Sequence, residues 1–413
     1  MGTIRINKLK PGMVLADDVR DIKGRLLLTR GKAIGPEHLR VFKIWGIPQV
    51  EVMGAPEGAE AAAVAALVDP ARMELVRKET EPLFRHTDLE HPAIREIFTQ
   101  AVAYRAAQPD PAPIVSLPPK EGDPAKTKNH PKDFLETFIE KDIALPEIPS
   151  IVFELNEVIA NPLSTADQMA QVIHKSPSLT ALLLKIVNSS FYGLPSKVDR
   201  VSLAVTMIGT RELSALALGI SILSVFKNIP RSLLNMKFFL QHSLACGIVS
   251  RLLAAQKNMR QTEQMFSAGL LHDLGRLFLF ICFPEEMLDV LRGALGNSTC
   301  LFMAEKKELG SHHAHIGKYI MNRWHLPLML ENTVCFHHEP EQSPDLVHAA
   351  IVHVADIVVN ALGIGTSGER WVPPLSMQAW ESLELPTGCI ELVVKQAVNQ
   401  IHTMEFLLQD HLL

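Results

Sequence analysis

Histidine and aspartate side chains gather in the second half of the sequence in an order that could bind metal. Ten of the seventeen histidines fall between residues 242 and 353. The side chains that stand out by type and spacing are His242, His272, Asp273, His313, His337, His338 and Asp356. Imidazole and carboxylate are the usual donors to zinc, iron and manganese where thiolates take no part. The pattern therefore predicts a site for one or two divalent ions of iron, manganese or zinc.

A simpler interpretation exists for each histidine taken singly. A lone histidine on an apolar helix face is most often a hydrogen-bonded core or boundary residue. We assign that role to His312, His315, His325, His348 and His353. His353 lies one turn before Asp356 and could instead support a ligand from behind. The joint order of the other residues favours a metal site, because several spaced positions agree.

Two residues of this group are also candidates for catalysis. Two metal ions about 4 Å apart can stabilise both the attacking and the leaving oxygen of a phosphoester. Asp273 follows His272 directly and could bridge two such ions. Arg276, one turn later, could neutralise phosphate charge in a bidentate manner. The alternative for Arg276 is a solvated cation at a helix end.

The candidate ligands must be positioned by helices, because helical periodicity dominates the sequence from residue 134 onward. Helical patterns cover 71–84, 92–107, 164–175, 178–188, 202–208, 211–226, 238–256, 264–280, 284–292, 313–324, 328–337 and 345–362. The segment 211–226 is apolar on almost every face, which predicts a buried helix. A capping box at 164–167 and an N-cap at Ser176 before Pro177 predict two helix starts. His272 and Asp273 fall inside one predicted helix, 264–280, so a shared ion must lie over the side between them.

The chain divides into segments of different composition. Residues 1–53 contain short β-type runs, turn signals and one predicted helix at 36–45, which indicates a small β-rich (α+β) module. Residues 54–108 form a helical connector, and 109–133 a linker rich in proline. Residues 134–413 form a mainly α, all-helical domain with parts at 134–235, 236–362 and 363–413. The fold class is therefore mainly α.

Composition excludes several classes of protein. A net charge of −5 argues against a general nucleic-acid-binding protein, since phosphate neutralisation needs a basic surface. The five cysteines form no CxxC pair, which indicates a reducing compartment and no thiolate zinc site. The first ten residues lack an apolar signal-peptide core, and the apolar stretches are interrupted or too short to span a bilayer. The sequence predicts a cytoplasmic protein without membrane insertion.

The order of the candidate ligands resembles that of the HD superfamily of metal-dependent phosphohydrolases. The segments 145–149, 173–179, 187–190 and 204–209, with the His337–Pro340 run, resemble the HDOD family of bacterial signalling proteins. This resemblance covers about residues 134–362. Separately, the segments 9–13 and 24–28, with Gly46, resemble the small module that precedes many HD-GYP cyclic-di-GMP hydrolases.

The HDOD resemblance implies a fold similar to that of HD hydrolases. Members of the HDOD family usually lack the full ligand set and serve as non-catalytic output or scaffold modules that bind signalling proteins. This chain departs from them by keeping every position that a two-metal HD site uses. It departs from HD-GYP enzymes too, because no Gly-Tyr-Pro follows Glu339 and Arg276 replaces their lysine.

Three interpretations stay open from the sequence. The favoured one is a signal-transduction protein whose HDOD domain binds protein partners. The second is a metal-dependent phosphodiesterase or phosphohydrolase that acts on a nucleotide second messenger. The third is a metal kept only to hold the helices together. We favour the first, since fold and motif do not establish catalysis.

Overall fold

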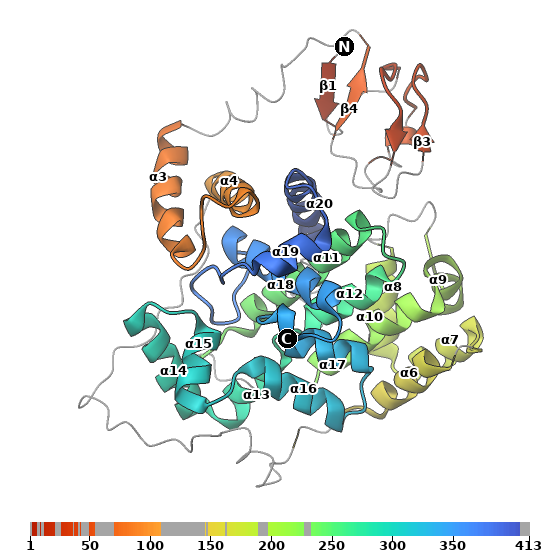
Figure 1. Ribbon diagram of the computed structural model, residues 1–413. Coiled ribbons are helices and arrows are strands. Elements are labelled where there is room, and N and C mark those ends of the chain that lie inside the picture. Colours follow the sequence, from red (N-terminus) through yellow and green to blue (C-terminus); the bar gives the residue numbers. More distant parts are fainter. Residues whose placement is uncertain are drawn as a thin grey trace.

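A computed structural model gives the fold of the chain (Figure 1). It describes residues 70–108, 197–226 and 233–404 without gaps, most of 145–188, and separate stretches within 2–53. Within these residues, strands occur only in the first 53 positions and every later element is a helix. The predicted fold class, an all-helical domain with a small β-containing module, is confirmed. The predicted linker at 109–133 lies outside the described residues.

The N-terminal residues form two short antiparallel pairs. Strand β1 (Gly2–Arg5) pairs with β4 (Gln49–Val52), with Gly2 opposite Val52, and β2 (Val19–Arg20) pairs with β3 (Leu26–Leu28). The sequence predicted β-type runs at 14–15, 25–29 and 49–52. The last two contain β3 and β4, residues 14 and 15 form isolated bridges, and β1 and β2 were not expected. Most of the predicted helix at 36–45 lies outside the described residues. Buried side chains here form a small core of their own, made of Leu9, Leu15, Val19, Ile34, Phe42, Val50 and Val52.

Two helices lie between residues 70 and 107, before the main group of helices. Helix α3 (Pro70–Thr80) and a 3-10 turn (Glu81–Phe84) lead to α4 (Pro92–Ala107), which has the bounds predicted from the sequence. Helix α4 packs on α18 (Leu346–Leu362) and α20 (Cys389–Met404). The Arg105 side chain donates from Nε to the carbonyl oxygen of Ala361 at 2.8 Å, near the end of α18. Helix α4 thus shares the core of the helical body.

The next group of helices carries clear start signals in the sequence. It comprises α6 (Ser150–Ala160), α7 (Ala166–His174), α8 (Pro177–Val187), α9 (Val201–Ile208) and α10 (Thr210–Leu223). Ser176 caps α8, and its side chain accepts from the backbone N–H of Leu179, as predicted. The capping box of α7 is formed by Thr165 and Gln168, one residue later than predicted. Helix α10 is buried on all sides from Leu213 to Leu223, as its apolar surface requires.

The predicted single helix at 264–280 is wrong, because the chain turns at the His-Asp dipeptide. Helix α11 (Met236–Gln256) is followed by α12 (Thr262–Leu271) and then α13 (Leu274–Cys282). His272 and Asp273 lie in the turn between α12 and α13. The apolar period continues across this turn, so periodicity gave no sign of it.

Among the described residues, two segments are long and apolar enough to span a membrane, judged by length and composition: α11 (Met236–Gln256) and the α12–α13 pair (Thr262–Cys282). Of these apolar windows, 83% and 89% of the residues are buried inside the protein. Such burial is typical of the core helices of a globular domain.

The remaining helices surround the candidate ligands. They are α14 (Pro284–Asn297), α15 (Leu301–Leu309), α16 (His313–Arg323), α17 (Leu328–Cys335), α18, α19 (Met377–Leu383) and α20, with a 3-10 turn at Pro340–Gln342. Helix α15 was not expected from the sequence. One continuous apolar core extends from Phe84 to Ile401 and joins α4, α6 to α10 and the ligand-bearing helices.

Candidate metal centre

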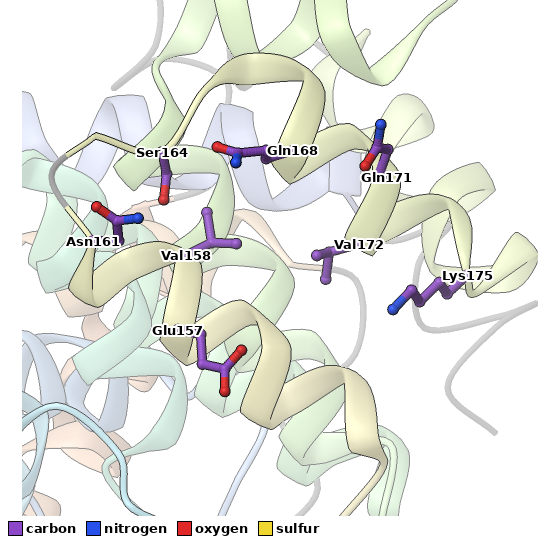
Figure 2. A pocket seen from close by; sticks show the side chains of 8 residues that line it. All are labelled: Glu157, Val158, Asn161, Ser164, Gln168, Gln171, Val172 and Lys175. Atoms are coloured by element: carbon purple, nitrogen blue, oxygen red, sulfur yellow. The ribbon is translucent and has the colours of Figure 1, made fainter.

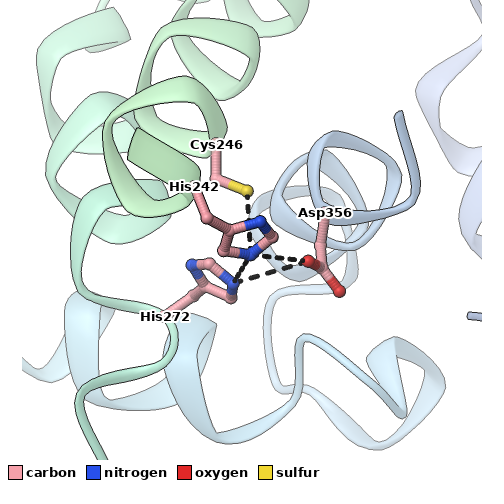
Figure 3. Close-up of side chains that lie close together, drawn as sticks. All are labelled: His242, Cys246, His272 and Asp356. Atoms are coloured by element: carbon pink, nitrogen blue, oxygen red, sulfur yellow. Dashed lines mark hydrogen bonds and ion pairs between the residues drawn. The ribbon is translucent and has the colours of Figure 1, made fainter. Parts of the chain in front are cut away.

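Three of the expected ligands and a cysteine converge on one point in the core (Figure 3). His242 projects from α11, His272 from the end of α12, and Asp356 from α18. Nε2 of His242 lies 3.3 Å from Nε2 of His272 and 3.2 Å from Oδ1 of Asp356. Cys246, one turn after His242, places Sγ 3.6 Å from the same nitrogen. The donor atoms of these four residues lie within 4.8 Å of one another. We call His242, His272 and Asp356 the first group.

Cys246 was missed as a neighbour of the first group, although its spacing from His242 puts both on one helix face. Burial and the charges of Asp356 and Asp273 raise the pKa of the Cys246 thiol well above its usual value. Without an ion the thiol therefore keeps its proton, and a bound ion would have to displace it, as at His272. Imidazole and carboxylate are the donors that the sequence predicted, and Sγ of Cys246 lies among them.

A second group lies beside the first. His313 begins α16, and His337 and His338 follow α17. Nε2 of His313 lies 3.4 Å from Nε2 of His337 and 3.2 Å from Nε2 of His338. The donor atoms of these three residues also fall within 4.8 Å of one another. We call them the second group.

The Asp273 carboxylate lies between the two groups. Its Oδ2 is 3.3 Å from Nε2 of His272 and 3.7 Å from Nε2 of His242. Its Oδ1 is 2.9 Å from Nε2 of His313. One oxygen thus faces each group, which is the arrangement expected of a carboxylate that bridges two ions. The structure brings all seven predicted ligands together.

Backbone carbonyls fix the direction of two of the imidazoles. Nδ1 of His272 lies 2.7 Å from the carbonyl oxygen of Gly269, and Nδ1 of His337 lies 2.7 Å from that of Val334. Donation to a carbonyl at Nδ1 leaves Nε2 facing the other ligands, as in known imidazole–metal sites. Held in this way, the residues fit a divalent ion.

His353 supports His337, as its position one turn before Asp356 suggested. Its Nε2 accepts from the backbone N–H of Ser376 at 2.9 Å. Its Nδ1 must then carry the proton, and it donates to the carbonyl oxygen of His337 at 2.8 Å. The second group is thereby tied to α18.

Two glycines allow the ligand helices to approach one another. A Cβ on Gly269 would lie 2.6 Å from the carbonyl oxygen of Cys246, where α12 crosses α11. A Cβ on Gly275 would lie 2.0 Å from the carbonyl oxygen of His313, where α13 meets α16. Real Cβ atoms do not come this close to backbone. Only glycine at these positions lets the turn with His272 and Asp273 sit against both neighbours.

Arg276 is 2% exposed, so its interpretation as a solvated cation is wrong. Its Nη1 donates to Oδ2 of Asp273 at 3.1 Å and to Oγ of Ser367 at 2.6 Å. Its Nε donates to Oε1 of Glu305 at 3.0 Å, and its Nη2 lies 2.9 Å from Nδ1 of His313. Protein groups therefore surround the whole guanidinium.

Glu305 is an important neighbour of the site that sequence reasoning missed. It is fully buried on α15, and its Oε2 accepts from the backbone N–H of His313 at 2.9 Å and lies 2.5 Å from the Nδ1 atom. Burial alone would raise the pKa of this carboxyl, but His313 and Arg276 lower it to about 2. A usable signal was present, because Glu305 shares one helix face with Leu301 and Leu309.

The charges divide the ligands into those that hold protons and those that do not. Burial opposes a proton on His272, but Asp273 and Asp356 outweigh it and raise the pKa of His272 to about 10. Burial and Arg276 oppose one on His313, and there Glu305 and Asp273 raise the pKa. Burial and neighbouring imidazoles lower the pKa of His337 to about 3. Despite burial, Arg276 and His272 hold the pKa of Asp273 well below its usual range.

A pocket of about 300 Å³ lies elsewhere, between α6 and α7 (Figure 2). Its lining residues are Glu157, Val158, Asn161, Ser164, Gln168, Gln171, Val172 and Lys175. None of them is a candidate metal ligand, so this pocket is separate from the site built above.

Part of the chain matches a known protein family. Residues 145–340 match the model of the HDOD domain family, a span that includes six of the seven candidate ligands and ends before Asp356. An uncharacterized protein of Treponema pallidum (strain Nichols) is 25% identical over 213 residues, which are 51% of this chain and 41% of that protein. The match therefore spans less than half the length of that relative.

Solved structures share the fold at low sequence identity. An HDOD domain protein from Geobacter sulfurreducens is 22% identical with a TM-score of 0.58, over 67% of this chain and 97% of that one. A candidate phosphohydrolase from Shewanella amazonensis SB2B is 20% identical with a TM-score of 0.53, over 66% and 98%. A candidate signal transduction protein from Marinobacter aquaeolei VT8 is 18% identical with a TM-score of 0.54, over 80% and 69%. These likenesses establish the helical fold.

Proposed function

Because an HDOD domain occupies residues 145–340, we propose that the chain is a signal-transduction protein. In this proposal the domain acts as an output or scaffold module for other signalling proteins, and it holds one or two divalent ions of iron, manganese or zinc. The ligands would be the first group, the second group and Asp273. Bound there, the ions would link helices that are far apart in the sequence and stabilise one arrangement of the domain.

Enclosure of the site is the observation that supports a non-catalytic role. His242, His272, Asp273, His313, His337 and Asp356 are each no more than 4% exposed. A phosphoester substrate must bring its phosphate within contact distance of the ions, and side chains cover that approach. His338 alone among the seven is half-buried.

The engagement of Arg276 supports the same conclusion. A residue that clamps phosphate presents free N–H groups to it. In this chain those groups face Asp273, Glu305, Ser367 and His313 instead. We therefore propose that Arg276 is a positioning residue that holds Asp273 directly and His313 through Glu305, and that Asp273 is a bridging ligand.

A second candidate function has one specific observation in its favour. The Asp273 carboxylate presents one oxygen to each group, and two bridged ions are the arrangement used in metal-dependent phosphoester hydrolysis. The alternative is thus a phosphodiesterase or phosphohydrolase acting on a nucleotide second messenger. It requires an opening of the site on the His338 side.

The N-terminal module completes the proposal. Residues 1–53 resemble in sequence the module that precedes HD-GYP domains, and their separate small core suits a sensing or docking role. Because the chain has a net charge of −5, we propose that its partners are proteins and not nucleic acids. We also propose a cytoplasmic location.

Metal content and hydrolysis together test the proposal. Full-length protein, reconstituted separately with manganese, iron and zinc, should hold at least one ion per chain. It should leave cyclic dinucleotides, linear dinucleotides and bis-para-nitrophenyl phosphate intact. Asp273→Asn should weaken binding more than about 100-fold, beyond the effect of losing an outer-shell partner. His402→Ala, on an exposed helix position, serves as the matched control.

Two outcomes would contradict this scheme in different ways. Less than one ion per chain after all three reconstitutions would remove the metal site. Metal-dependent turnover that Asp273→Asn abolishes would replace the scaffold role by the hydrolase.

A further inference from the structure

A third cluster of metal-binding side chains lies outside both groups. It consists of His312 and His315, which flank the start of α16, and Glu339, which follows the second group. The three donor atoms, one from each residue, lie within 4.8 Å of one another. From the sequence, both histidines were expected to be hydrogen-bonded core or boundary residues, and Glu339 was given no role.

His312 is the residue that points to a ligand. Its side chain is 1% exposed, and neither Nδ1 nor Nε2 has a hydrogen-bond partner. A buried polar atom without a partner is destabilising, so natural structures seldom keep one unless a water or an ion satisfies it. Both imidazole nitrogens of His312 are in this state.

The neighbouring donors are arranged around that ring. The His312 and His315 rings have centroids 4.2 Å apart. Nδ1 of His315 lies 3.3 Å from Oγ of Ser311, which leaves its Nε2 for another contact. Oε1 of Glu339 pairs with Nζ of Lys306 at 2.8 Å, and Oε2 accepts from Nε2 of Gln342 at 3.1 Å.

These existing contacts do not use up the Glu339 carboxylate, because its two oxygens offer about four lone-pair positions. The half-exposed Lys306 side chain is free to swing toward solvent when a cation binds. The cluster is distinct from the second group, since the His312 and His338 ring centroids are 6.2 Å apart. His312 and His313 point to different groups, although they are adjacent in sequence.

We propose that His312, His315 and Glu339 form a third binding site, selective for a divalent transition-metal ion such as zinc. Two imidazoles and one carboxylate are a donor set that suits zinc, with a fourth position left for water. His315 and Glu339 are only half-buried, so this ion exchanges with solvent more readily than ions held by the enclosed ligands. The proposal does not depend on the first two groups being occupied.

Zinc titration of the full-length protein tests the third site. Wild-type protein should bind one more zinc ion per chain than His312→Ala, measured by calorimetry and by elemental analysis. Glu339→Gln, which keeps the size of the side chain, should weaken this ion at least about tenfold. His402→Ala should leave the stoichiometry unchanged.

The Asp273→Asn background separates this site from the proposed centre. In that variant one zinc ion should remain, and adding His312→Ala should remove it. Equal stoichiometry in wild type, His312→Ala and Glu339→Gln would overturn the third site whatever the state of the other two. If His312→Ala is unfolded by circular dichroism, His315→Ala at the half-exposed position decides the question, and retention of the ion there overturns the proposal.

Discussion

At the scale of single residues, protons and metal ions compete for the imidazole nitrogens that lie beside the buried carboxylates. Asp273 and Asp356 raise the pKa of His272 to about 10, and Asp273 with Glu305 raises that of His313. A proton on either imidazole supplies positive charge beside these carboxylates, which a bound ion would otherwise supply. His337 has its pKa lowered to about 3 and is ready to bind without losing a proton.

Metal affinity should therefore rise with pH. Below its pKa of about 10, His272 holds a proton that an ion must displace. Raising the pH from 6 to 9 lowers the concentration of the protons that compete with the ion for this nitrogen. Each displaced proton should increase the apparent affinity by up to about tenfold per pH unit. Calorimetry in buffers of different ionisation enthalpy counts the protons released. A constant affinity across this range would contradict the charge balance described here.

Replacing Arg276 should expose the cost of buried carboxylates. Arg276→Met replaces the guanidinium by an unbranched apolar side chain and removes the cation that pairs with Asp273 and Glu305. Removing one partner of a buried ion pair typically costs about 3–5 kcal/mol. Added manganese or zinc should restore part of this loss, because an ion supplies positive charge to Asp273.

Denaturant unfolding with and without metal measures both effects. The matched control is Arg95→Met, whose pair with Glu90 is 60% and 89% exposed. That change should alter the free energy of unfolding by no more than about 1 kcal/mol. An equal change in the free energy of unfolding at the two positions would show that the buried Arg276 pairs stabilise the fold no more than an exposed pair does.

Residue types alone nominated the seven side chains that lie together in the structure, but not the residues that support them. His and Asp are recognisable donors, so their order in the sequence was enough to nominate them. Glu305 shares a helix face with Leu301 and Leu309, but helix α15 itself was not expected, so this signal was not used. Cys246 was not singled out from the sequence, because an apolar period does not distinguish a thiol beside a ligand from one beside leucine.

At the scale of elements, the close approach of helices decides where the ligands meet. Helix periodicity predicted α4 correctly and α18 to within one residue. It missed the turn at His272–Asp273, because apolar residues continue in phase on both sides. The turn depends on tertiary contacts at Gly269 and Gly275 that the local sequence does not encode.

Gly275→Ala should damage the centre through the backbone. The new Cβ would lie 2.0 Å from the carbonyl oxygen of His313, so α13 and α16 must separate. Overpacking of this kind costs about 1–3 kcal/mol or more, and the shift of His313 should weaken metal binding at the second group. Gly293→Ala in α14 has nothing within 4 Å and should instead stabilise by about 0.5–1 kcal/mol. Thermal melts and metal titration of both variants check the contrast.

At the scale of the whole molecule, one apolar core joins parts that the sequence separates. The core runs from Phe84 to Ile401 and includes α4. From the sequence, α4 was expected to belong to a helical connector at 54–108. Residues 1–53 instead bury their apolar side chains in a separate small core. Composition predicted a β-containing module at the start of the chain and helices after it. It could not indicate which helices share a core, because that depends on contacts between distant segments.

Two deletions should therefore differ sharply in their effect on the helical body. Removal of residues 1–69 takes away the N-terminal module and leaves α3 and α4 in place. Its main unfolding transition should stay where it is in the full chain. Removal of residues 1–108 uncovers the α18 and α20 surfaces that α4 covers, together with the carbonyl oxygen that Arg105 binds.

The larger deletion removes Ile94, Ile97, Phe98 and Val102 from the core. Each such side chain contributes about 1.5–3 kcal/mol when buried, so a loss of at least about 4 kcal/mol is expected after allowance for compactness of the unfolded chain. Differential scanning calorimetry of the two truncated proteins and the full chain makes the comparison. If both deletions leave the main transition unchanged, α4 is a connector and not part of the folding unit. If both lower it equally, the N-terminal module stabilises the body and its separate core is not an independent unit.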